Sequence, residues 1–185
     1  MSTARIALPR ALAALRHRNF RLFFLGQFIS LIGTWMQSTG AAWMMTTLDP
    51  SPVMVALVQT ASSIPVFLLG FAAGAIADIV DRRVVLIGTQ VWMLLSAALL
   101  SILTYLGLTT PVFLLLLTFS LGLGSAVMSP AFQAIFPELV QRKELPAAVT
   151  LNGVSFNIAR SIGPALGGAV VALAGPGPVF LLNAF

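Results

Sequence analysis

Residues 74–83 read GAIADIVDRR and lie between two long apolar runs. The 185-residue chain has ten Lys or Arg and five Asp or Glu, and this decapeptide alone holds two acids and two arginines. Hydrophobic residues make up 58% of the chain and charged residues 8%, whereas soluble domains are about one-quarter charged. So few charges cannot cover a surface in water. The sequence therefore predicts helices that are surrounded by lipid and joined by short polar segments.

Five apolar runs are long enough to cross a membrane, which takes about 20 residues of helix. Turns that contain proline separate most of them, because proline ends one helix and suits the first turn of the next. Residues 1–19 form a tail, and residues 20–185 form one transmembrane unit. Within that unit the expected spans are 20–47, 53–77, 84–105, 111–136 and 146–174, followed by 178–185, an incomplete sixth. The prediction is an all-α membrane protein.

The basic residues give the orientation. Nine of the ten lie in the tail and the start of the first span, in the joint at 82–83, or in the joint at 142–143, and the joints on the opposite side hold none. The positive-inside rule places these segments, and the N-terminus, in the cytoplasm. The net charge of +5 is then a topology signal, so no nucleic-acid partner is expected. The rival interpretation of the first span, a signal peptide, requires a shorter apolar region of about 7–15 residues.

The first, second and fourth expected spans carry polar residues along one face when wound as helices. Gln27, Thr34 and Gln37 share a face of the first span, and Ser125 lies on a similar face of the fourth. Small residues on such a face can also serve close helix packing. However, an amide without partners in hydrocarbon costs several kcal/mol, so the glutamines favour a shared water-filled cavity.

The fifth span carries Asn157 and Arg160 on a face rich in glycine. Arg160 lies about 21 Å along the helix axis from Pro146, which is near the middle of the membrane. A charge there costs about 2.5–3.5 kcal/mol on insertion scales. Two interpretations stay open for Arg160: a contact with the substrate in the cavity, or a structural bond to helix carbonyls or to Asn157.

The chain has no Cys, and its one histidine, His17, lies in the tail. None of the expected spans contains Asp or Glu. A serine–histidine dyad, an HExxH zinc site or an embedded acid pair would need such residues inside a span. We therefore predict no catalytic residues, no metal ligands and no cofactor, and the sequence argues against an intramembrane enzyme.

Two motifs resemble those of the major facilitator superfamily. The loop of residues 74–83 resembles its signature between spans two and three, and the fifth span resembles its antiporter-type GP-x-x-GG motif. Residues 18–37 and 151–160 are similar to the secretion-effector branch, which includes siderophore and macrolide exporters. The matching residues are Gly74, Asp78, Asp81, Arg82 and Arg83 in the loop, and Gly163, Pro164, Gly167 and Gly168 in the fifth span.

The resemblance implies a secondary transporter that exports an amphipathic small molecule by alternating access, in the bacterial inner membrane. The fold it implies is the N-terminal six-helix bundle half of a major facilitator fold, truncated in the sixth helix. The partners implied are the lipid bilayer, a small-molecule substrate and the missing C-terminal half, since the substrate site lies between two halves. The alternative is a membrane scaffold that does not transport, or a half-transporter that depends on a partner.

The sequence departs from the family pattern at several positions. Ile79 replaces a basic residue and Asp81 a glycine in the loop signature. Thr118 lies near the position of an arginine found in proton-coupled relatives, and Gln27 stands where several of those relatives have a carboxylate. Because the expected spans offer no carboxylate, proton coupling would depend on residues outside this sequence.

The resemblance also gives the charged loop a role. Asp78 is expected to bond to Arg82 or Arg83, or to face the positive N-terminus of a helix in the other half. Such a contact would hold the transporter closed to the cytoplasm and release when the halves move. In the alternative interpretation, the arginines only set the topology and the acids are incidental.

Overall fold

The computed structural model describes residues 14–184, and for residues 70–79 it describes the backbone alone. All regular elements in this part of the chain are helical. In chain order they are α1 (Arg18–Leu48), α2 (Pro52–Ile79), α3 (Arg82–Tyr105), α4 (Pro111–Leu139), the short 3₁₀ turn η2 (Arg142–Glu144), α5 (Leu145–Ala174) and α6 (Gly177–Ala184). Each α-helix begins and ends within three residues of an expected span.

Four of the described helices are long and apolar enough to cross a membrane: α2, α3, α4 and α5. The 31 residues of α1 give a helix of about 46 Å, which exceeds the hydrocarbon thickness of about 30 Å. However, α1 is not among the four, since its polar residues lower its hydropathy. Length and composition thus support the all-α membrane class, and the crossing of α1 stays a prediction.

Local signals set the helix ends. The Thr110 hydroxyl accepts a hydrogen bond from the Phe113 amide (3.2 Å), and Pro111 occupies the first turn of α4. At the start of α3, an Asp81 carboxylate oxygen accepts from the Arg83 amide (2.8 Å). The C-cap of α5 is Gly175, whose φ of +80° is accessible to glycine and strained for other residues. These caps set the ends of the helices at the joints.

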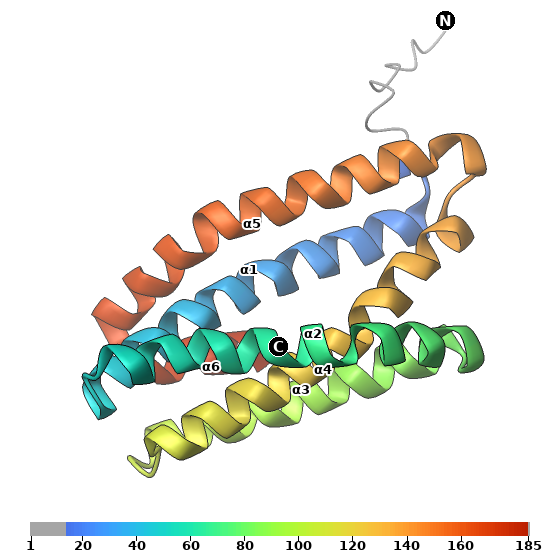
Figure 1. Ribbon diagram of the computed structural model, residues 1–185. Coiled ribbons are helices and arrows are strands. Elements are labelled where there is room, and N and C mark those ends of the chain that lie inside the picture. The colour runs from blue at the N-terminus through green and yellow to red at the C-terminus, as the bar shows by residue number, and fades with distance from the viewer. Residues whose placement is uncertain (1–13, 185) are drawn as a thin grey trace, which may run out of the picture.

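The helices form two packed groups (Figure 1). The long helices α1 and α5 lie side by side, and α4 packs against both α2 and α3. The short α6 contacts α3 and α1 and so connects the two groups. A cavity lies between the groups, and polar residues of α1, α2 and α4 line it.

Aromatic side chains fill one end of the bundle. Phe20 of α1 is fully buried, and Phe132 and Phe136 of α4 are nearly so. The Phe23 and Phe132 rings stack with centroids 4.8 Å apart. Many large apolar side chains elsewhere are exposed, up to 88% for Leu173, as expected for helices whose solvent is lipid.

Candidate functional site

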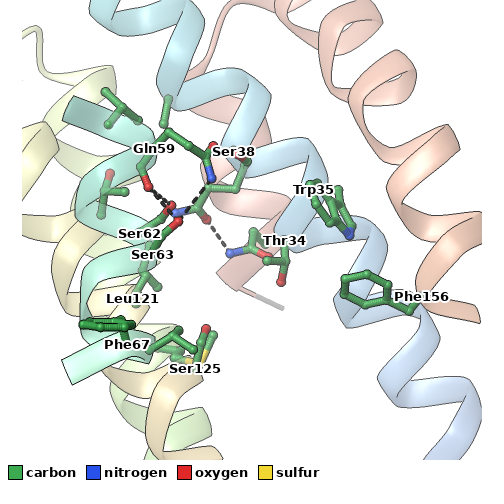
Figure 2. A pocket seen from close by; sticks show the side chains of 18 residues that line it. Thr34, Trp35, Ser38, Gln59, Ser62, Ser63, Phe67, Leu121, Ser125 and Phe156 are labelled. Carbon is green, nitrogen blue, oxygen red and sulfur yellow. Dashed lines mark hydrogen bonds between the residues drawn. The ribbon is translucent and has the colours of Figure 1, made fainter. Parts of the chain in front are cut away.

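A cavity of about 650 Å³ lies among α1, α2 and α4, with single contributions from α3, α5 and α6 (Figure 2). One wall is polar, and Gln59, Ser62 and Ser63 of α2 gather there beside Ser38 of α1. The opposite side is aromatic. Trp35 and Phe156 have ring centroids 5.9 Å apart at 72°. A cavity of this size and mixed lining can hold a small organic molecule.

The cavity brings together three of the side chains that the sequence placed in a shared cavity: Thr34, Gln37 and Ser125. Gln37 is 6% exposed, and its Oε1 accepts a hydrogen bond from Asn183 Nδ2 of α6. Polar residues of α1, α2 and α4 line this cavity together.

The other three candidates, Gln27, Asn157 and Arg160, are not among the lining residues. The Asn157 amide nitrogen instead donates to the Gly153 carbonyl of its own helix (2.8 Å). The Arg160 guanidinium carbon lies 5.8 Å from the centroid of the Trp35 ring, a cation–π contact. Arg160 therefore contacts Trp35, which lines the cavity, and is not itself among the lining residues.

Sequence reasoning missed the aromatic wall and Asn183 as members of the cavity. In the sequence, Trp35 and Phe156 are indistinguishable from other apolar residues of their spans. Helical periodicity alone does not separate a residue that faces lipid from one that faces a cavity. Asn183 lies in the short helix α6, where few positions define a face. One signal was available: an asparagine in an apolar helix requires a polar partner.

None of the cavity-lining residues that the structure describes is ionisable. Three of the hydroxyl groups donate to carbonyls of their own helices. Thr34 donates to Ser30 (3.0 Å), and Ser62 and Ser63 donate to Gln59 (2.8 and 2.9 Å). The cavity therefore presents neutral polar groups, and several of their protons are already used. Within residues 14–184, leaving aside the side chains of 70–79, no group of three His, Asp or Glu could hold a metal ion.

The GP-x-x-GG residues of α5 lie in part against α1. A Cβ placed on Gly163 would lie 2.4 Å from the Trp35 Cβ, and one on Gly167 would lie 2.8 Å from the Met36 Cα. In contrast, a Cβ on Gly168 would meet nothing within 4 Å, and Pro164 lies inside the helix. Gly163 and Gly167 thus allow the close approach that places Trp35 beside the cavity.

The charged segment of residues 74–83 runs from the end of α2 to the start of α3, and its side chains are described from residue 80 onward. Arg82 Nη1 donates to the Ala134 carbonyl (3.0 Å) and to the Glu138 carboxylate of α4. Sequence reasoning did not identify Glu138 as a partner. Gly74 and Asp78 lie in the last turns of α2, and the Asp78 side chain, with the bond expected from it, is outside what the structure describes.

A second polar contact lies at the joint before α5. His17 Nε2 donates to Glu144 Oε2 at 2.6 Å, because an ionised carboxylate can only accept. The hydrogen bond from His17 holds the pKa of the Glu144 carboxyl below its ordinary value of 4.5. This contact ties the segment before α1 to the segment before α5.

Comparisons with known proteins agree with the geometry. Residues 9–185 match the family model described as transmembrane secretion effector. The chain is 33% identical over 165 residues to the staphyloferrin A transporter of Staphylococcus aureus, covering 89% of this chain and 42% of that protein. It is 27% identical over 159 residues to the uncharacterized MFS-type transporter YfiS of Bacillus subtilis, covering 85% of this chain and 37% of that protein.

A third relative is macrolide efflux protein A of Streptococcus pyogenes, 23% identical over 156 residues, covering 82% of this chain and 38% of that protein. The chain thus spans less than half the length of these curated relatives. No solved structure matches it. The relatives are named as transporters, which confirms the expectation that the chain is not an enzyme. Motifs, helical architecture and family match together show that the chain belongs to the transmembrane secretion effector family of the major facilitator superfamily.

Proposed function

We propose that the protein in which these residues occur is a secondary active transporter that exports an amphipathic small molecule by alternating access. The observation that carries the proposal is the cavity of about 650 Å³, with one polar and one aromatic wall, among helices of membrane-spanning length. Relatives named for a siderophore and for macrolide efflux support a small-molecule substrate. The location that fits is the bacterial plasma membrane, with the N-terminus in the cytoplasm.

In this proposal, Thr34, Gln37 and Ser125 contact the substrate directly. Gln27, Asn157 and Arg160 border the site. The cation of Arg160 acts through Trp35, by fixing the ring that lines the cavity and by adding positive potential beside it. The lipid bilayer surrounds the outer faces, and a further bundle supplies the other side of the site, as in the two-half architecture of the superfamily.

The segment of residues 74–83, which runs from the end of α2 to the start of α3, serves as the cytoplasmic gate in this proposal. Its residues are Gly74, Asp78, Asp81, Arg82 and Arg83. Support comes from Asp81, which caps α3, and from Arg82, which joins the start of α3 to the end of α4 through Glu138. These contacts make the ends of α3 and α4 move together when the helices rock.

The test compares cells that produce the complete protein with cells that carry the empty vector. Mass spectrometry of the medium should find at least one amphipathic compound that accumulates only with the protein. A protonophore combined with a sodium ionophore should abolish that accumulation, since secondary transport depends on an ion gradient. An Arg160→Gln variant should reduce export, whereas Arg160→Lys should retain more of it. Identical media from both cell types, or export that survives collapse of the gradients, would contradict the proposal.

A further inference from the structure

Four basic residues gather at one corner of the bundle, where α1 and α5 begin. We call them the basic corner, and they are Arg16, Arg18, Arg142 and Lys143. The first two flank His17, and the last two come just before Glu144. The hydrogen bond from His17 Nε2 to Glu144 Oε2 (2.6 Å) therefore brings two pairs of cations together from distant parts of the chain.

The basic corner lacks a counter-charge in the described part of the chain. All four of its residues are exposed, and none of them forms an ion pair with a described acid. The acid that lies in the corner, Glu144, is engaged by His17. The first turns of α1 and α5 contain no acid either. Cations gathered in this way repel one another, so the corner favours an anionic partner.

The orientation of the chain in a membrane does not require this arrangement. The positive-inside rule counts basic residues near the ends of the spans, wherever those residues lie around the bundle. Arg83 satisfies the rule equally well at the start of α3, which packs mainly against α4 and α6. The tertiary fold adds something that the rule does not demand, because it places the cations before α1 beside those before α5.

The surroundings of the basic corner favour a lipid over a soluble anion. The candidate membrane span of α5 begins at Arg142, so the corner lies where the apolar part of the bundle begins. Exposed apolar side chains follow within the first turns, since Leu22 of α1 is 58% exposed and Val149 of α5 is 54% exposed. A phospholipid can pair its phosphate with the cations and its acyl chains with these apolar side chains, whereas a free phosphate can use only the cations.

We propose that the basic corner binds the headgroup of an anionic phospholipid of the surrounding bilayer. The headgroup phosphate bridges the segments that precede α1 and α5, and the acyl chains follow these two helices, which lie side by side (Figure 1). The lipid thereby supplies the counter-charge that the described residues lack. This inference concerns the lipid partner and does not depend on what the protein transports.

The test measures lipid binding by the complete protein in micelles of an uncharged detergent. Native mass spectrometry, with palmitoyl-oleoyl phosphatidylglycerol or palmitoyl-oleoyl phosphatidylcholine added in steps, gives an apparent Kd for each lipid. Phosphatidylglycerol should bind more tightly than phosphatidylcholine, which has the same acyl chains and no net charge.

Substitutions in the two halves of the basic corner should have similar effects. Arg142→Gln should weaken phosphatidylglycerol binding about fivefold, which is the contribution expected of one basic residue at a membrane surface. Arg18→Gln should weaken it by a similar factor, since both side chains face the same headgroup in this proposal. Arg142→Lys keeps the charge and should stay within about twofold of wild type.

Arg83→Gln is the matched control. It removes the same charge from an exposed residue at the start of α3, outside the basic corner. Phosphatidylglycerol binding by this variant should stay within about twofold of wild type. Because all the substituted residues are exposed, the variants should fold like the wild type, and thermal unfolding without added lipid checks this.

Equal binding of the two lipids would overturn the inference, as would unchanged phosphatidylglycerol binding in both Arg18→Gln and Arg142→Gln. An equal loss in Arg83→Gln would also overturn it, because lipid would then respond to the total charge of this side of the protein. Glycerophosphoglycerol, the headgroup without acyl chains, should not displace phosphatidylglycerol at equal concentration. Displacement would show that the partner is a soluble anion and would contradict the proposal.

Discussion

His17 and Glu144 form a hydrogen bond of 2.6 Å between Nε2 and Oε2, although 127 positions separate them in the chain. The bond connects the segment before α1 to the turn before α5. Beside it, Phe20 and Phe136 pack edge to face with centroids 6.1 Å apart. At this end of the bundle, the contact between His17 and Glu144 therefore lies next to an apolar cluster.

The lowered pKa of Glu144 predicts a dependence on acid. Because the pKa is lower in the folded state than the ordinary 4.5, the contribution to stability is fully present above 4.5 and is lost as the pH falls through the folded value. Glu144→Gln should lower the thermal unfolding midpoint of the complete protein at neutral pH. The difference from wild type should shrink progressively below pH 4.5, as measured by thermal unfolding across that range.

The control for this contact is a double-mutant cycle with His17→Ala. If the two side chains stabilise the fold through one shared hydrogen bond, the double variant should lose little more stability than either single variant. Additive losses, or a Glu144→Gln effect that persists unchanged in acid, would show that Glu144 stabilises the fold through other contacts.

The two neighbouring glycines of α5 should respond in opposite ways to alanine. Gly167→Ala places a methyl 2.8 Å from the Met36 Cα and carbonyl oxygen, so α1 and α5 must separate, at a cost of about 1–3 kcal/mol. Gly168→Ala meets nothing within 4 Å and should be neutral, or stabilising by up to about 1 kcal/mol through helix propensity. Thermal unfolding of both variants in detergent checks this. Equal effects would show that α1 and α5 do not approach closely at Gly167.

The ion pair between Arg82 and Glu138 should by itself contribute little to the free energy of unfolding. Their side chains are 38% and 50% exposed, and exposed pairs are worth about 0–1 kcal/mol. Glu138→Gln should therefore cost less than about 1 kcal/mol of unfolding free energy. Arg82→Ala should cost about 1 kcal/mol more, because it also removes the bond to the Ala134 carbonyl.

Arg83→Ala is the control, since the described contacts of Arg83 involve its backbone amide rather than its guanidinium. Equilibrium unfolding in mixed micelles measures all three variants. An Arg83→Ala effect as large as that of Arg82→Ala would mean that the charge itself, rather than the contact with α4, stabilises the loop.

The hydrogen bond between Gln37 and Asn183 should contribute more to the free energy of unfolding than the exposed ion pair, because Gln37 is buried. Gln37→Leu removes the oxygen that accepts from Asn183 and leaves that amide nitrogen without its partner, at a cost of about 1–3 kcal/mol. Gln27→Leu is the comparison, since Gln27 is half-buried outside the cavity, and should stay within about 0.5 kcal/mol. Similar losses in thermal unfolding for both variants would contradict a specific α1–α6 contact.

The sequence by itself determined the helices and their joints, because these depend on neighbours in the chain. Apolar runs of spanning length, the cap at Asp81, the Thr110–Pro111 start of α4 and the Gly175 end of α5 are local signals. The motifs around residues 74–83 and 163–168 also identified the family. The polar face of α1 was predictable to within the arc that helical periodicity allows.

Only the tertiary structure decided which side chain meets which. Periodicity places Asn157 and Arg160 on one polar face, yet Asn157 bonds within its own helix and Arg160 lies over Trp35. The partners of Gln37 and Arg82 come from helices far away in the chain. The burial of the Thr118 hydroxyl without a hydrogen-bond partner among the described residues follows only from the packing of the neighbouring helices. The physical reason is that a helix sequence defines its own faces, whereas the angles and distances at which helices pack decide what each face contacts.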